Sequence, residues 1–171
     1  MAGEVRTLAD GNLKIALLTT KPANPAAITL TELMAGQEAA EHLAKSTTRF
    51  SPTASETIAD GRVSDKGNPN SLGGSNYEAN LGVFWLLDQT GKYVEAANPV
   101  FEAVREKGAL VWFVLREGPD EAVDWAQGDD YEVYEVISDN PQRPSENSGY
   151  VKRIVPLQVQ RRDEGKVATT P

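Results

Sequence analysis

The stretch from Gly73 to Glu117 constrains the fold most, because a long alternating segment, a helix signal and an apolar run follow one another there. Between positions 75 and 87 one face carries Ser75, Tyr77, Ala79, Leu81, Val83, Trp85 and Leu87. The other face starts polar, with Asn76, Glu78 and Asn80, and turns apolar at Phe84 and Leu86. This period of two predicts one long β-strand over 75–87 with a buried face.

A helix and a second strand are predicted after a break at Asp88–Gly91. Asn98 is expected to cap the helix and Pro99 to open it, because the first helical position needs no N–H. The apolar stripe is Val100, Phe101 and Val104, the last turn holds Arg105 and Lys107, and Gly108 is the expected stop. The run Ala109–Leu115 is too short to span a membrane and favours a strand covered on both faces.

Most of the remaining chain also predicts strands, at 13–19, 57–64, 130–138 and 149–160. Thr29 and Glu32 have capping-box spacing, which predicts a short helix ending at Gly36. Pro156 cannot donate to a ladder, so the last strand should be bulged there or lie at an edge. Residues 65–74 are rich in Gly and Asn and predict a long loop, and 161–171 are expected to form a C-terminal tail, loose from Gly165 onwards.

Many short strands with one clear helix predict a mainly β domain over 1–160: a β-sandwich or distorted barrel with a flanking α-helix. The 171 residues, 40% of them hydrophobic, suit one domain with a sizeable core. No cysteine is present, which excludes a disulfide framework and thiolate metal sites. Without an apolar leader at the N-terminus, we expect a soluble protein made in a reducing compartment, with no membrane binding of its own.

The residues give no positive case for catalysis. His42 is the only histidine, so a nucleophilic triad would have to be built around it, and a lone His is far more often an ordinary residue. No phosphate-binding or dinucleotide motif occurs, and residues 65–70 lack the distal glutamate of a calcium loop. Asp129 and Asp130 are better explained as a solvated turn than as a glycosidase pair. We expect no enzyme activity, no metal and no cofactor.

Four segments together resemble the major tail (tail tube) proteins of long-tailed bacteriophages. They are Thr29–Gly36, Asp60–Pro69, Ser75–Leu81, and the predicted helix together with Val111–Arg116. None is diagnostic alone, and their order and spacing across 13–160 carry the resemblance. It also places a strand at 40–50, although Glu38–Lys45 has helix-forming composition, a weak prior that tertiary context overrides.

The resemblance implies a virion structural protein of the phage tail, assembled in the host bacterial cytoplasm. Six copies would form a ring whose inner strands close into a shared β-barrel, and rings would stack around a tape-measure protein between tail terminator and tail tip proteins. Genome DNA would pass through the lumen during ejection. The long loop would reach the next ring through Asp65, Lys66, Asn68, Asn70 and Ser71. Other interpretations are a head–tail connector, a capsid decoration protein or a small acidic binding domain.

Two further sets of residues are candidates for the tube. Asn76, Glu78 and Asn80 form the polar face of the long strand and are candidates for the lumen wall, where a lack of positive charge would let DNA slide. Charge is also uneven: 117–135 holds eight acids and no Lys or Arg, whereas 143–166 holds six basic residues. These are either two solvated faces or complementary surfaces between copies.

A subunit interface would then use Asp120, Asp124, Arg161 and Arg162. Trp125 lies in a polar, acidic segment and either anchors a neighbouring copy or folds back on its own domain, with equal weight. Trp85 and Trp112 lie in apolar strands and are expected in the core.

Overall fold

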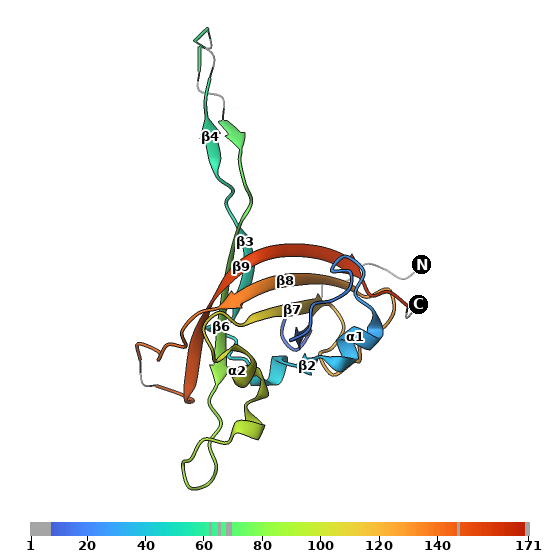
Figure 1. The fold of residues 1–171 in the computed structure, drawn as a ribbon, viewed down its shortest axis with the longest axis vertical. Helices are drawn as coiled ribbons and strands as arrows, with labels where there is room; N and C mark the ends of the chain where they lie inside the picture. The colour runs from blue at the N-terminus through green and yellow to red at the C-terminus, as the bar shows by residue number, and fades with distance from the viewer. Residues whose placement is uncertain (1–7, 62, 65, 68–69, 147, 170–171) are drawn as a thin grey trace.

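A curved antiparallel sheet of seven strands forms the body of the molecule (Figure 1). The computed structural model describes residues 8–61, 63–64, 66–67, 70–146 and 148–169. The strand order is β2-β1-β7-β8-β9-β6-β3. The strands are β1 (Leu13–Leu18), β2 (Gln37–Glu38), β3 (Arg49–Thr53), β6 (Asn76–Phe84), β7 (Leu110–Glu117), β8 (Asp130–Ser138) and β9 (Lys152–Lys166). Two further strands, β4 (Thr57–Ala59) and β5 (Asn70–Leu72), pair only with each other in a hairpin outside this sheet.

The sheet curls into a distorted barrel. Phe50 of β3, the last strand of the sheet, has its ring centroid 5.1 Å from that of Phe113 on β7 and 5.4 Å from that of Tyr134 on β8. The chain from β2 to β3 bridges the two ends of the sheet, because the Ala39 N–H bonds Ile15 on β1 and the Ala44 N–H bonds Gly82 on β6. The expected mainly β architecture is therefore confirmed.

Successive side chains along β1, β7 and β8 point to opposite faces of the sheet, so the hydrophobic core has two parts. The barrel interior takes Ile15, Leu17, Val111, Phe113, Tyr134 and Val136, with Val100, Phe101 and Val104 of helix α2 (Pro99–Val104). The other face of the same strands takes Ala16, Leu18, Trp112, Val114, Tyr131 and Val133, with Leu33 of helix α1 (Leu30–Ala35). Both faces of β7 are covered, as its continuous apolar run predicts.

The two α-helices begin where the sequence predicts, but only one uses the predicted cap. Thr29 and Glu32 form the capping box of α1. Asn98 makes no capping bond. Its side chain instead accepts from the Leu86 N–H at 2.9 Å and donates to the carbonyls of Leu86 (3.0 Å) and Val94 (2.7 Å). The helix also ends at Val104, so Arg105 and Lys107 lie beyond it and Gly108 is not its stop.

This use of Asn98 explains why the predicted strand over 75–87 is too long. Strand β6 ends at Phe84, and from there the chain leaves the sheet. The Asn98 amide takes the place of a strand partner for the backbone of Leu86, which turns the chain toward the short 3₁₀ helix η2 (Glu95–Ala97).

Three other segments differ from their predicted secondary structure. Residues 40–50 hold the 3₁₀ helix η1 (Ala40–His42) and only the start of β3, because the segment must turn to cross from β1 to β6. The strand predicted at 57–64 is the three-residue β4. The predicted C-terminal tail is part of the folded body as far as residue 168. Strand β9 runs to Lys166, Val167 is buried, and Ala168 forms a β-bridge with Thr29.

The bulge or edge position predicted from Pro156 is also absent. Strand β9 lies inside the sheet, and the irregularity falls near Gln160, opposite Glu135 and Val136. The Pro156 carbonyl accepts a hydrogen bond from the N–H of Asp139, the first residue after β8. The missing N–H of Pro156 therefore faces a position where the ladder between β8 and β9 has already ended, and no ladder hydrogen bond is lost.

Candidate assembly surfaces

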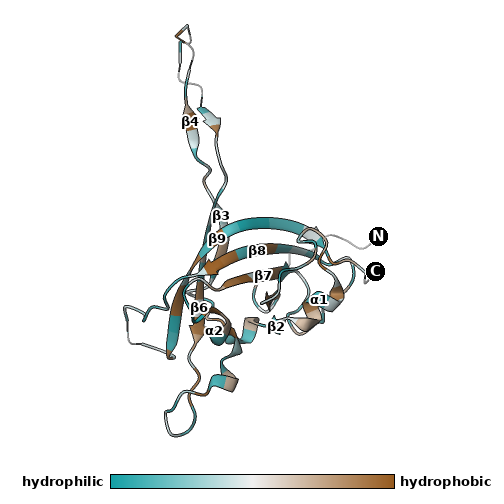
Figure 2. Ribbon diagram, in the orientation of Figure 1, coloured by the Kyte–Doolittle hydropathy of each residue, from teal (hydrophilic) through white to brown (hydrophobic). Residues whose placement is uncertain are grey.

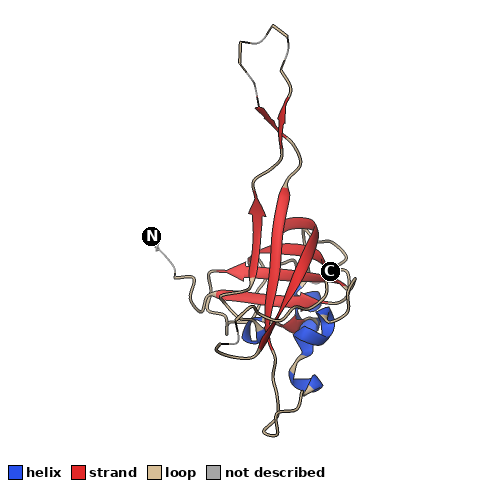
Figure 3. Ribbon diagram, turned by 90° about the vertical axis from the view of Figure 1, so that its left-hand side faces the viewer, coloured by secondary structure: helices blue, strands red, loops and turns tan. Residues whose placement is uncertain are grey.

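The hairpin of β4 and β5, here called the arm, stands away from the body on the chain that connects β3 to β6 (Figures 1 and 3). Thr57, Ile58 and Ala59 pair with Leu72, Ser71 and Asn70. The loop predicted at 65–74 is thus partly strand, since Asn70 and Ser71 belong to β5, while Lys66 lies in the bend between the strands. The predicted inter-ring residues Asp65 and Asn68 fall outside the described residues.

The arm contains hydrophobic residues (Figure 2), and their side chains are exposed to solvent. Ile58 is 56% exposed, Leu72 is 80% exposed, and Val63 is fully exposed. A two-stranded hairpin of this length is at best marginally stable by itself in water. Apolar groups on such a ribbon, held away from the core, are typical of a surface that a partner covers.

A polar sheet face lies at the base of the arm. Asn76, Glu78 and Asn80 point away from the barrel interior on β6, opposite Thr53, Ser51 and Arg49 of β3. The Arg49 and Glu78 side chains form an ion pair at 3.4 Å. On the other side of β6, exposed Gln158 continues this face two residues after Pro156 of β9, the partner of Asn80. The face is therefore mostly uncharged, and its central opposite charges are paired.

The acidic and basic segments meet inside one subunit. Strands β8 and β9 are neighbours, and Arg162 contacts Glu132 at 2.8 Å while Lys166 contacts Asp130 at 2.9 Å. Arg162 also donates to the Tyr134 hydroxyl at 3.2 Å and pairs with Glu164. Asp130 and Glu132 of the acidic segment are thus part of an ion-pair ladder between neighbouring strands, and Arg162 is engaged within its own chain.

This ladder shifts the ionisation of its members. Burial raises the pKa of Tyr134 to about 12, and the carboxylate of Glu132 adds to the effect. For Glu132, burial would raise the pKa, but the hydrogen bonds from Arg162 and Tyr134 outweigh it and lower the pKa. Arg161, by contrast, is exposed and pairs with Asp163 at 2.6 Å.

Trp125 folds back on its own domain. The side chain is 7% exposed and packs with the core between the sheet and α1, so it is not free to anchor a neighbouring copy. The Arg116 guanidinium carbon lies 5.2 Å from the centroid of its ring. Asp120 and Asp124 lie in the same loop and are exposed, whereas Trp85 is half-buried and Trp112 is buried.

Arg116 organises the loop that carries Trp125. Its side chain is 1% exposed and pairs with Asp129 at 2.9 Å. The two terminal nitrogens also donate to the carbonyls of Asp120 (3.2 Å), Val123 (2.8 Å) and Asp124 (2.9 Å). Sequence reasoning missed this role, although a lone arginine at the end of the apolar run 109–115 was a signal for it.

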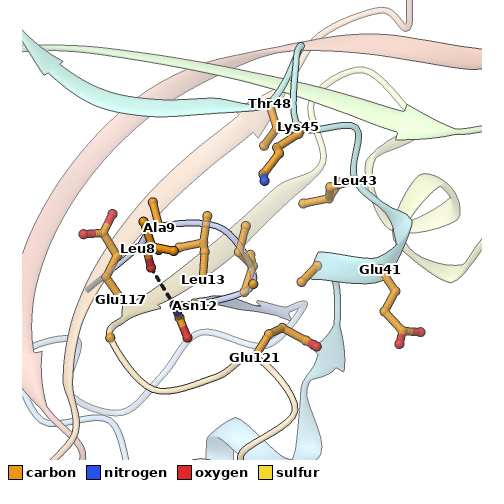
Figure 4. Close-up of a pocket in the computed structure, with 14 residues that line it drawn as sticks. Leu8, Ala9, Asn12, Leu13, Glu41, Leu43, Lys45, Thr48, Glu117 and Glu121 are labelled. Atoms are coloured by element: carbon orange, nitrogen blue, oxygen red, sulfur yellow. Dashed lines mark hydrogen bonds between the residues drawn. The ribbon is translucent and has the colours of Figure 1, made fainter. Parts of the chain in front are cut away.

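An apolar groove of about 610 Å³ opens between the start of β1 and the chain preceding β3 (Figure 4). Leu8, Leu13, Ile15 and Leu43 supply its apolar wall, and Glu41, Glu117 and Glu121 are also at its lining. His42 is not among the lining residues, so no nucleophile–histidine pair is built there. Over the described part of the chain, no cluster of His, Cys, Asp or Glu could hold a metal ion. No described helix is long and apolar enough to cross a membrane.

These features describe a β-barrel with an apolar projection and outward polar surfaces. The sequence matches the family model described as phage tail tube protein over residues 1–170, and the chain belongs to that family. This confirms the resemblance. None of the curated proteins matches the sequence.

The fold is also similar to a chain in a solved structure, titled as the cryo-EM structure of the anti-feeding prophage (AFP) baseplate, 6-fold symmetrised. The two chains are 11% identical and superpose with a TM-score of 0.54, over 96% of this chain and 97% of that one. At this identity the similarity concerns the fold alone. The family match supports a virion structural protein of the tail, and the structural match supports its fold.

Proposed function

We propose that the protein forms hexameric rings that stack into the tail tube, the conduit through which genome DNA leaves the virion. The arm carries this proposal, because a ribbon with exposed Ile58 and Leu72 has no core of its own and projects where a stacked copy would lie. A contact between two different surfaces of identical copies does not close on itself and generates a filament. The six-fold symmetry named for the similar baseplate chain agrees with a six-membered ring.

Barrel closure between copies is part of this proposal. Strand β3 ends the seven-stranded sheet, so one of its backbone edges is unpaired within that sheet. An exposed edge is a template for strand pairing. Neighbouring copies in a ring would cover such edges and join their polar faces into one lumen wall. Within the tail, a tape-measure protein, tail terminator and tail tip proteins are the expected partners, and assembly would take place in the host bacterial cytoplasm.

Electron microscopy of purified full-length protein tests this function. We expect rings with six-fold symmetry at low protein concentration and tubes at high concentration, because stacking is a mass-action process. A reconstruction would place Asn76, Glu78 and Asn80 on the channel wall. Particles that stay monomeric at every concentration would contradict the proposed function.

The lumen assignment makes a separate prediction for Glu78→Lys. Tubes should still form, because the side chain is exposed and its pair with Arg49 is a surface pair worth little free energy. The change puts six additional cations on each ring in the proposed hexamer, and these would bind phosphates by counterion release. Virions carrying the variant should eject DNA more slowly, with the delay shrinking as salt increases. The neutral control, Glu78→Gln, should eject at the normal rate. If Glu78→Lys behaves like that control, the residue does not line the channel.

A further inference from the structure

The chain that follows β6 lies at the end of the molecule opposite the arm (Figure 1), and exposed apolar side chains in and near this region, here called the basal surface, form a second apolar surface. Its exposed side chains are Leu86, Leu87, Tyr150 and Val151, and the partly buried Phe84 lies beside Tyr150. The Tyr150 ring lies edge-on to Phe84, with centroids 5.8 Å apart, and the Trp85 N–H bonds the Val151 carbonyl at 2.9 Å. Tyr150 is nevertheless 83% exposed and Val151 is 52% exposed.

Strand β6 connects the two apolar surfaces. It begins at Asn76, where the arm ends, and finishes at Phe84, where the basal surface begins. A copy displaced along the direction of β6 therefore brings its arm toward the basal surface of the copy ahead of it. Neither surface contacts the other within one chain, since they lie at opposite ends of the molecule (Figure 1).

Charge on the two surfaces is complementary. Lys152 and Arg153 follow Val151, and Arg143 lies close enough to Arg153 that burial and this second cation lower the pKa of Arg153. None of the ion pairs among the described residues includes these three cations. The same is true of two exposed acids among the described residues beside β4: Glu56, which precedes the strand, and Asp60, which follows it.

The carboxylate of Asp88, which follows Leu87, is hydrogen-bonded within its own turn. The Asp88 carboxylate accepts from the Thr90 and Lys92 N–H groups of its own turn, at 2.8 and 2.9 Å. Arg153 stacks on Trp85, with its guanidinium carbon 4.3 Å from the ring centroid, which fixes one of the cations beside the apolar side chains. Among the described residues, the basal surface therefore has unpaired cations beside its apolar groups, whereas Glu56 and Asp60 lie beside the strand of the arm that carries Ile58, with Lys66 farther out in the bend of the arm.

We propose that the arm of one copy docks on the basal surface of a second copy of this chain. Ile58 and Leu72 cover Tyr150 and Val151, while Glu56 and Asp60 face the cations of the basal surface. This inference rests on the proposed stacking and names the surface that receives the arm. The contact is heterologous, so each copy gives its arm to one neighbour and receives the arm of another.

The absence of cysteine makes a disulfide test clean. Leu72 and Tyr150 are both exposed, so Leu72→Cys and Tyr150→Cys should fold normally. A copy carrying both changes should form a ladder of covalent oligomers when tubes are oxidised, because a chain with two thiols links to two neighbours. An equal mixture of the two single variants should stop at dimers that contain one of each.

The matched control pairs Leu72→Cys with Met34→Cys. Met34 is 73% exposed but lies on α1, away from the basal surface. This pair should give no ladder. Ladders from the Met34 pair as strong as those from the Tyr150 pair would overturn the proposal, and so would a mixture whose dimers join Leu72→Cys only to itself.

Charge exchange gives an independent readout. Glu56→Lys should raise the protein concentration needed for half-maximal tube formation severalfold, and adding Lys152→Glu should bring it back toward the wild-type value. No recovery in the double variant would contradict the predicted pairing. Tubes that form without any Leu72–Tyr150 cross-link would refute this docking and leave the tube function standing, whereas a failure of rings and tubes would refute the function itself.

Discussion

Replacing residues 57–72 with a short Gly-Ser turn is expected to abolish tube formation while leaving a folded subunit. The body should survive because the ladder between β3 and β6 reaches Thr53 and Asn76 without any contribution from β4 or β5. Stacking should fail because burying a Leu or Ile side chain contributes about 1.5–3 kcal/mol. Every subunit of a ring loses this burial free energy, so losing only part of it in each copy is enough to prevent polymerisation.

Circular dichroism, thermal unfolding and sedimentation would separate these two effects. The deletion should keep the strand signal and the melting transition of the body but remain in the supernatant. A milder variant, Ile58→Ser with Leu72→Ser, keeps the hairpin length and should raise the concentration for assembly without eliminating it. Normal tubes from the deletion would exclude the arm as the stacking element.

The sequence predicts the parts of this fold that depend on local patterns. The continuous apolar run of β7 and the alternation in β8 lie almost where expected, and the Thr29–Glu32 capping box opens α1. Each of these signals is contained in a few neighbouring residues. The family resemblance is likewise visible from short segments in a fixed order, and the family match confirms it.

The errors occur where distant residues decide the structure. Asn98 has the local signature of a helix cap, yet its amide binds the backbone of Leu86, twelve positions earlier, and no local pattern encodes that choice. Residues 37–48 must cross from one end of the sheet to the other, which neither helix nor strand propensity predicts. Strand β9 continues past Gln160 because β8 offers it partners up to Lys166.

Charge patterning misleads for a similar reason. The acidic and basic segments are separated in the sequence but adjacent in the sheet, and Arg162, Glu132 and Glu164 pair across and along β8 and β9. Among the described residues, the charges without an intramolecular ion pair include some that are less conspicuous in the sequence, such as Glu56 and Asp60 beside β4 and the cations beside the basal surface. Charged residues that pair within the folded chain therefore have to be set aside before the remaining charges can indicate a binding partner.

Arg116→Ala is expected to lower the free energy of unfolding by about 3–5 kcal/mol, the range for removing one partner of a buried ion pair. The change leaves the Asp129 carboxylate without its cation and three backbone carbonyls without a donor. Because Trp125 packs beside the guanidinium, its ring should become exposed as the loop detaches. Denaturant unfolding would measure the loss, and a red shift of the tryptophan emission would report the exposure. Arg161→Ala is the matched control, since that arginine is exposed, and its effect should stay within about 0.5 kcal/mol.

A double variant tests whether Arg116 only pairs with Asp129 or also holds the backbone of the loop in place. Replacing both members of a buried ion pair by apolar residues of similar volume is often neutral. Arg116→Met with Asp129→Leu should nevertheless remain destabilised, because the carbonyls of Asp120, Val123 and Asp124 lose their charged donor, and a hydrogen bond to a charged group contributes about 1.5–3 kcal/mol. Asp129→Leu would also remove the acceptor for the Ala126 N–H. Recovery of wild-type stability in the double variant would show that Arg116 serves only its carboxylate. Persistent loss would show that its main role is to hold the backbone of the loop that carries Asp120, Asp124 and Trp125 in its folded conformation.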